Sequence, residues 1–151
     1  MAQGATYSFK SLTGVMTNPL FGAVIPLTGG SIGAGSFRVA MTMERTVHDV
    51  AADGTVMVSY VAGDNGTLDI EVQESSLLHQ ELLGLYNACL VAADNDDVAA
   101  WAATVISFRM LTDGSQHIFS GVSFSKFPDK PYEAHGQRVT WRMMVANAIN
   151  M

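Results

Sequence analysis

Charged residues are scarce in this sequence. The 151 residues include 8 lysines and arginines and 14 aspartates and glutamates, so that charged residues make up 15% of the chain against 48% hydrophobic residues. The surface of a small soluble monomer normally carries about 25–35% charged residues. We therefore expect much of this protein's surface to contact other protein. The formal net charge of −6 also argues against tight binding of DNA or RNA, which requires a basic surface.

Cysteines and long hydrophobic runs are scarce as well. Cys89 is the only cysteine, so the chain cannot form an internal disulfide, and this is typical of a protein made in a reducing cytoplasm. The apolar run Leu20–Leu27 is far shorter than the roughly 20 residues that span a bilayer, and Pro26 interrupts it. The segment Met1–Lys10 lacks the apolar run behind a basic head that marks a secretory signal. We expect a soluble protein that is not exported and has no membrane partner.

The patterns typical of catalytic, cofactor and metal sites are also missing. The glycine-rich segment Gly29–Gly35 is followed by a predicted strand and no lysine, unlike a phosphate-binding loop. The acidic run Asp94–Asp97 lacks the glycine and the closing glutamate of a calcium-binding loop. The four histidines have no HxxxH or HxH spacing, and no GxSxG nucleophile motif occurs. We predict no catalytic residue, no cofactor and no metal, and therefore a protein that is not an enzyme.

Alternation of apolar and polar residues dominates the sequence and predicts a mainly β chain. The pattern is clearest in Gly66–Glu74, whose polar face is acidic. It also runs from Phe37 as far as Val50, which predicts one unusually long strand. Asp53-Gly54 is a tight-turn signal before Thr55–Val61, so the two segments predict a hairpin. Further strands are predicted at Thr104–Leu111, Ile118–Phe124 and Arg138–Ala146.

Helical periodicity occurs convincingly once, over about Ser76–Leu90, where apolar residues recur at spacings of three and four. Ser75 or Ser76 is the predicted N-cap. The segment Asp94–Ala103 fits either a short second helix or a loop. Loops are predicted at Thr28–Gly35 and Lys126–Gln137. Strands around one helix, with no internal repeat or linker, predict a single α+β or mostly-β domain over residues 1–151.

Several short segments follow one another in a distinctive order. Residues 5–10 read ATYSFK and run straight into a strand, and the acidic strand ends in VQESS at residues 72–76. The leucine-rich helix closes on LYNA at residues 85–88. The last third contains VSFSKFPD at residues 122–129, Tyr132, and VTW at residues 139–141. Together these segments resemble the small proteins that build the tail tube of contractile-tailed phages, and the resemblance spans most of the chain.

The resemblance implies a tail-tube-like antiparallel β-sandwich or half-barrel with one flanking α-helix, closing into a hexameric ring with a continuous inner β-barrel. It implies a virion protein, made in the host cytoplasm, whose rings stack into a hollow tube that conducts DNA. Its partners would be further copies of itself, a tail sheath protein outside, and baseplate or initiator and terminator proteins at the ends. DNA and a tape measure protein would pass without tight binding. The alternatives are a tail terminator or tube-initiator ring protein of similar fold, or a small-ligand-binding β-barrel.

Two sets of site residues are predicted for such a tube. Glu44, Asp69 and Glu71 would face the lumen, where carboxylates repel DNA within about a Debye length, roughly 8 Å at physiological salt; ordinary solvated positions are the alternative. The N-terminal arm Met1–Thr6 and the hairpin tip are candidates for contact with the neighbouring ring because both are expected to protrude. The tip residues are Ala51, Ala52, Asp53 and Gly54.

Overall fold

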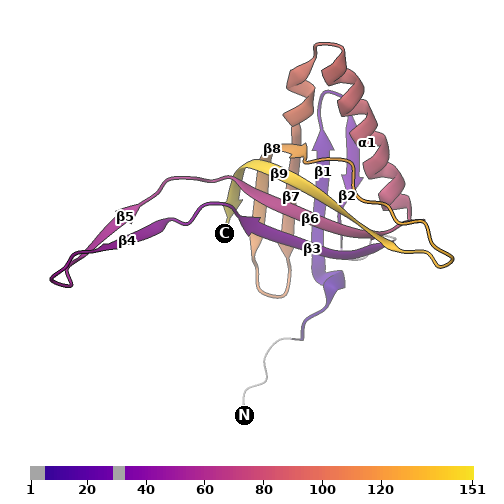
Figure 1. Ribbon diagram of the computed structural model, residues 1–151. Helices are drawn as coiled ribbons and strands as arrows, with labels where there is room; N and C mark the ends of the chain where they lie inside the picture. The colour runs from indigo at the N-terminus through magenta and orange to yellow at the C-terminus, as the bar shows by residue number, and fades with distance from the viewer. Residues whose placement is uncertain (1–5, 29–32) are drawn as a thin grey trace.

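The computed structural model shows a curled seven-stranded antiparallel sheet, one long helix, and a two-stranded hairpin that projects from the body (Figure 1). It describes residues 6–28 and 33–151. The sheet order is β2-β1-β7-β8-β9-β6-β3. The strands of the sheet are β1 (Leu12–Asn18), β2 (Ala23–Pro26), β3 (Ala34–Met41), β6 (Gly66–Gln73), β7 (Thr104–Met110), β8 (Gln116–Phe124) and β9 (Arg138–Asn150). The predicted fold class, mainly β with a half-barrel sheet and one flanking α-helix, is confirmed.

One apolar core lies between the long helix α1 (Leu77–Asp94) and one face of the sheet. In β6 and β9 buried and solvent-facing residues alternate strictly along most of the strand, as the sequence predicts. Trp141 of β9 is fully buried, with its ring centroid 5.5 Å from that of Phe124 and 5.9 Å from that of Tyr86 on α1. Each large apolar side chain buried in this way contributes about 1.5–3 kcal/mol.

The helix begins where the sequence predicts. Ser76 is the N-cap, and its Oγ accepts a hydrogen bond from the backbone N–H of His79 at 3.1 Å. The helix continues to Asp94, four residues beyond the predicted end at Leu90. After it comes the short 3-10 helix η2 (Val98–Ala102). Of the two structures predicted for Asp94–Ala103, a short second helix or a loop, the short helix is therefore the correct one. A second 3-10 helix, η1 (Phe9–Ser11), precedes β1.

The prediction of one long strand from Phe37 to Val50 is wrong. The segment forms β3 in the large sheet and β4 (Thr46–Val50) in the hairpin, with a break between them. The backbone N–H of Thr42 still donates to Asn65 at the end of the β3–β6 ladder, whereas the carbonyl of Arg45 accepts from Val61 of the hairpin. The chain therefore changes pairing partner across the break while its apolar–polar alternation continues, and alternation alone does not reveal this.

Other boundaries also differ from the predicted ones. Strand β2 lies inside the apolar run Leu20–Leu27, for which the sequence predicts no strand, and it pairs with β1. Strand β9 extends to Asn150 because its last residues continue to pair with β8. The predicted loop Lys126–Gln137 is confirmed. The predicted loop Thr28–Gly35 lies partly outside the described residues, and its last two residues, Ala34 and Gly35, begin β3.

Candidate functional site

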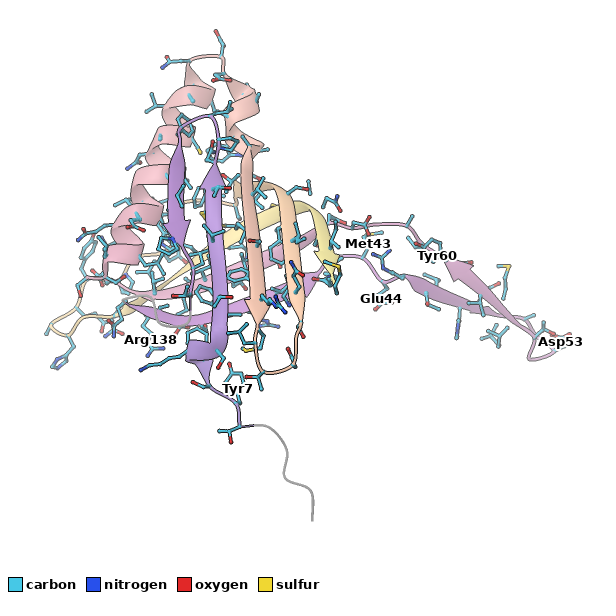
Figure 2. The ribbon with its side chains drawn as sticks, turned by 180° about the vertical axis from the view of Figure 1, so that it is seen from behind. Tyr7, Met43, Glu44, Asp53, Tyr60 and Arg138 are labelled. Carbon is cyan, nitrogen blue, oxygen red and sulfur yellow. The ribbon has the colours of Figure 1, made fainter. Side chains whose placement is uncertain are left out.

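The hairpin of β4 and β5 (Val56–Tyr60), hereafter the arm, extends well away from the body in both views (Figures 1 and 2). Its two strands pair with each other in a separate two-stranded sheet, with His48 opposite Val58. All five residues of β4 are exposed, and in β5 only Ser59 is partly buried. An isolated two-stranded hairpin is at best marginally stable in water. The arm therefore gains little stability from its own packing.

One side of the arm is mainly apolar. Because residues directly opposite each other in a hairpin share a face, the pairing register divides the side chains into two sets. The more apolar set is Thr46, His48, Val50, Val56, Val58 and Tyr60. Val58 is 64% exposed and Tyr60 is 75% exposed. Exposed apolar surface grouped in this way is typical of interaction sites. From the segment Thr55–Val61 the sequence predicted only a strand, although Val56, Val58 and Tyr60 of this segment lie on the apolar side.

The predicted turn at the tip of the arm is confirmed. The backbone N–H of Ala51 donates to Thr55 at 2.8 Å, and that of Gly54 donates to Ala51 at 2.9 Å. Gly54 has φ +89°, a conformation that glycine adopts without steric cost. The Asp53 carboxylate accepts a hydrogen bond from the backbone N–H of Thr55, which lowers the pKa of Asp53. Figure 2 shows Asp53 at the far end of the arm.

The base of the arm is tied to the body. Arg45 precedes β4 and Asp64 follows β5, and their side chains form an ion pair that joins these two segments at the base of the arm. The backbone carbonyl of Asp64 accepts a hydrogen bond from the N–H of Ala148 in β9 at 2.7 Å. These contacts join the two sides of the base to each other and to β9.

The outward side of β3, β6 and β9, hereafter the polar face, carries a row of paired charges. Asp69 lies opposite Arg38 on one neighbouring strand and opposite Arg142 on the other. Arg142 Nε donates to Asp69 Oδ1 at 3.0 Å, which raises the pKa of Arg142. Arg138 Nη1 donates to Glu71 Oε1 at 2.8 Å. The two acidic residues of β6 are thus each matched by an arginine of β9.

The charge balance of the polar face differs from that of the whole chain. Three arginines, Arg38, Arg138 and Arg142, and two carboxylates, Asp69 and Glu71, point outward from these strands, so the face carries +3 − 2 = +1. The chain as a whole carries −6, which leaves −6 − 1 = −7 on the remaining surface. The masked residues 1–5 and 29–32 contain no charged side chain, so both sums cover the same charges. The acidity of β6 is local, and neighbouring strands neutralise it.

The structure brings together two of the three predicted lumen carboxylates. Asp69 and Glu71 share the polar face, whereas Glu44 lies in the segment between β3 and β4, outside the large sheet (Figure 2). The predicted inter-ring residues Ala51, Ala52, Asp53 and Gly54 lie together at the arm tip. The predicted N-terminal arm Met1–Thr6 lies, except for Thr6, outside the described residues.

Two titratable side chains, His79 and Cys89, are buried in the interior of the subunit. His79 Nδ1 accepts a hydrogen bond from Trp141 Nε1 at 3.0 Å, and burial lowers the pKa of His79. Burial raises the pKa of Cys89, which keeps its thiol protonated and unreactive. Within residues 6–28 and 33–151, no three histidine, cysteine, aspartate or glutamate side chains are grouped to hold a metal ion. The helices in that part of the chain are too short or too polar to cross a membrane.

Comparison with known proteins identifies the family. The family model of the bacteriophage PhiTE tail tube protein matches residues 4–151. The chain belongs to this tail tube family. The resemblance drawn from the sequence segments is confirmed, and so is the prediction that the chain is not an enzyme, because a tail tube protein is a structural component of the phage tail. A comparison with curated proteins finds none that matches the sequence.

Solved structures with the same fold come from contractile injection systems. A chain of the anti-feeding prophage baseplate is 7% identical with a TM-score of 0.60, over 100% of this chain and 97% of that one. A chain of the anti-feeding prophage tube-terminating cap is 8% identical with a TM-score of 0.52, over 100% and 93%. A chain of the extended PVC sheath-tube complex is 8% identical with a TM-score of 0.51, over 97% and 91%. At these identities the likeness establishes the fold of the tail tube chain.

Proposed function

We propose that this tail tube chain, acting as one domain over residues 1–151, is the repeating subunit of the tube. Six copies close into a ring, rings stack into a hollow tube, and DNA passes through the tube into the host. The observation that carries this proposal is the arm, whose apolar side has no cover in the isolated subunit. When an arm binds a different surface of the next copy, the contact is heterologous and produces rings or open polymers. The anti-feeding prophage baseplate, which contains a chain of this fold, is six-fold symmetrised, and this supports the ring size.

We assign the stacking contact to the arm tip, Ala51–Gly54, together with the apolar side behind it. In Figure 2 the tip is the part of the arm farthest from the body. The ion pair and the hydrogen bond at the base of the arm connect it to the body before assembly. A pre-directed arm loses less conformational entropy on docking than a free loop does. Growth of the tube by successive rings follows from this arrangement, because each ring presents the same arms to the next.

We assign the polar face of β3, β6 and β9 to the lumen. On β9, Arg142 and Trp141 point to opposite sides, and α1 packs against Trp141, so the helix lies behind the polar face. Asp69 and Glu71 then face the DNA as members of ion pairs, and the wall carries a net charge of only +1 per subunit. Duplex DNA therefore meets alternating charges at short range, which bind it weakly and allow it to slide. Glu44 stands outside this face, near the boundary with the arm.

The partners of the tube follow from the same proposal. A sheath protein lies outside, as supported by the chain of this fold in the PVC sheath-tube complex. Baseplate or initiator proteins lie at one end and a terminator at the other. DNA and the tape measure protein occupy the lumen. The mature protein is then part of the virion, and it is synthesised in the host cytoplasm.

The test is to remove the arm and to alter its two sides separately. Replacing residues 46–60 with Asn-Gly leaves the large sheet intact, so we expect a folded subunit that forms no tubes in negative-stain electron microscopy. Val58→Glu places a charge on the apolar side and should abolish tubes, whereas Ser59→Glu, on the opposite side, should preserve them. Normal tubes from the armless variant would refute the role of the arm.

A second candidate is a ring protein at the end of the tube. The fold is shared with the anti-feeding prophage tube-terminating cap and with its baseplate, and this favours a terminator or initiator as the alternative. Polymer length separates the two functions, because a tube subunit stacks without limit and an end protein stops at one or two rings. Particles of a single ring at high protein concentration would favour the end protein.

A further inference from the structure

A hollow of about 350 Å³ lies beside the first residues of β9, hereafter the basic hollow. Its charged lining residues, Lys126, Asp129, Arg138 and Arg142, carry +3 − 1 = +2. The whole chain carries −6 and has only 8 lysines and arginines, and three of these line this one hollow. The basic hollow therefore attracts a negatively charged group to a subunit that is acidic elsewhere.

The basic hollow also contains an open strand edge. The backbone N–H of Ser125, just after β8, donates to the carbonyl of Arg142 at 3.0 Å. The backbone groups of a strand alternate between its two neighbours, so those of Thr140 and Arg138 point to the same side as those of Arg142. Within the described residues, no backbone hydrogen bond reaches Thr140 or Arg138 from that side. The backbone of another chain can pair with such an edge.

Two of the three cations in the basic hollow are available for a further contact. Arg142 is held by Asp69, with Nε 3.0 Å from Oδ1 and Nη2 3.5 Å from Oδ2. Arg138 uses Nη1 for its ion pair within the sheet, and its guanidinium carries several further N–H donors. Lys126 Nζ lies 3.9 Å from Oδ1 of Asp129, and the two side chains are 72% and 98% exposed, so this pair is weak.

The basic hollow and the arm lie at opposite ends of the same strands. Strand β6 starts near the arm base with Gly66 and ends at Gln73, opposite Arg138 of β9. Figure 1 shows the loop before β9 on the side of the body away from the arm, and Figure 2 shows Arg138 and Asp53 on opposite sides of the body. A second copy shifted along these strands therefore brings its arm tip to the basic hollow.

The arm tip has the complementary charge. Asp53 is the only charged residue of Ala51–Gly54, and residues 46–60 carry −2 from Asp49 and Asp53. Oδ1 of Asp53 accepts the hydrogen bond from the N–H of Thr55 at 2.9 Å, which leaves Oδ2 for an external partner. The other tip residues are two alanines and a glycine, whose small side chains allow the tip backbone to approach a strand edge.

We infer that the basic hollow is a binding site for the arm tip of the next copy, in which Lys126 and Arg138 bind the Asp53 carboxylate. The open edge at Thr140 binds the tip backbone. This inference rests on the proposed tube function, which leaves the surface that receives the arm unassigned. Because the tip and its binding site lie at opposite ends of one chain, the contact is heterologous and repeats without closing. One end of a tube then exposes acidic tips, and the other end exposes basic hollows.

The experiment measures the protein concentration at which tubes appear in negative-stain electron microscopy. Asp53→Asn removes the charge but keeps an oxygen that accepts the hydrogen bond from Thr55, so the turn is retained. Lys126→Asp reverses a charge of the basic hollow at an exposed position. We expect each variant to raise the required concentration by about tenfold or more. The double variant Asp53→Lys with Lys126→Asp restores an opposite pair, so it should form tubes at about a tenth of the concentration that Asp53→Lys alone requires.

Two control variants match these changes. Asp113→Asn alters the same kind of turn in the hairpin of β7 and β8, where the Asp113 carboxylate accepts a hydrogen bond from the N–H of Ser115 at 2.8 Å. Lys10→Asp makes the same charge reversal outside the lining of the basic hollow. Both controls should form tubes at the wild-type concentration.

The outcomes separate this inference from the proposed function. Tube formation by Asp53→Asn and Lys126→Asp at the wild-type concentration would overturn the binding site, while the armless variant would still report on the arm. A double variant that is no better than Asp53→Lys alone would refute the direct pairing. If the wild type stops at single rings, or if the armless variant forms normal tubes, the proposed function fails and this inference fails with it.

Discussion

The proposed assignment of the polar face to the lumen makes a quantitative prediction about DNA passage. The double variant Asp69→Asn with Glu71→Gln removes both carboxylates without changing side-chain size. The face then changes from +3 − 2 = +1 to +3 per subunit. Both ion pairs are at least partly exposed, and pairs of this kind contribute about 0.2–1 kcal/mol each, so the subunit should still fold and assemble.

The expected effect is electrostatic retention of DNA in the tube. Each additional phosphate contact steepens the dependence of log affinity on log salt by about 0.9. If the freed arginines of a ring engage four more phosphates, the affinity changes about 150-fold between 50 and 200 mM salt. We expect triggered DNA release from variant tails to be slow at 50 mM salt and to recover at 200 mM, whereas wild-type release should change little. Release is followed with an intercalating dye.

A matched variant separates net charge from the loss of an ion pair. Asp69→Asn with Arg142→Gln removes one pair and leaves the face at +2 − 1 = +1, so it should release DNA like the wild type. If the carboxylate-free variant forms tubes and releases DNA at the wild-type rate at both salt concentrations, the assignment of the polar face to the lumen is wrong.

Three further predictions concern the subunit itself. Leu82→Ala empties part of a fully buried site between α1 and the sheet and should lower the free energy of unfolding by about 2–5 kcal/mol in urea titrations; a loss below 1 kcal/mol would contradict the described core. Ser76→Ala removes the N-cap hydrogen bond and should cost about 0.5–2 kcal/mol in the same assay. Burial lowers the pKa of His79 below its ordinary 6.5, so the unfolded chain takes up a proton first, and stability should fall as the pH drops from 6.5 towards the pKa of the folded state. The melting temperature of a His79→Gln variant should show a weaker fall over that range, and an unchanged slope would exclude His79 as its cause.

Local patterns in the sequence were sufficient for several elements of this fold. The N-cap at Ser76 and the turn at Asp53-Gly54 depend on hydrogen bonds between residues two or three positions apart, and both are confirmed. The alternation in β6 likewise reflects one buried and one exposed face of a single strand. These features were predictable because neighbouring residues alone determine them.

The remaining features of the fold depend on pairing between strands and side chains that are far apart in the sequence. The alternation from Phe37 to Val50 continues through the break, and only the change of partner from β6 to β5 separates sheet from arm. The sequence indicated an acidic strand face, whereas Asp69 is neutralised by Arg142, which lies 73 positions away in the chain. The charge of a sheet face is a sum over strands that lie side by side, and their order is set by tertiary packing. The sequence by itself therefore determined a mainly β chain of the tail tube family with a helix beginning at Ser76 and a turn at Asp53-Gly54. The tertiary structure determined that its acidic strand lies in a face where arginines of neighbouring strands pair with the carboxylates, and that its longest strand pattern divides into a sheet strand and a projecting arm.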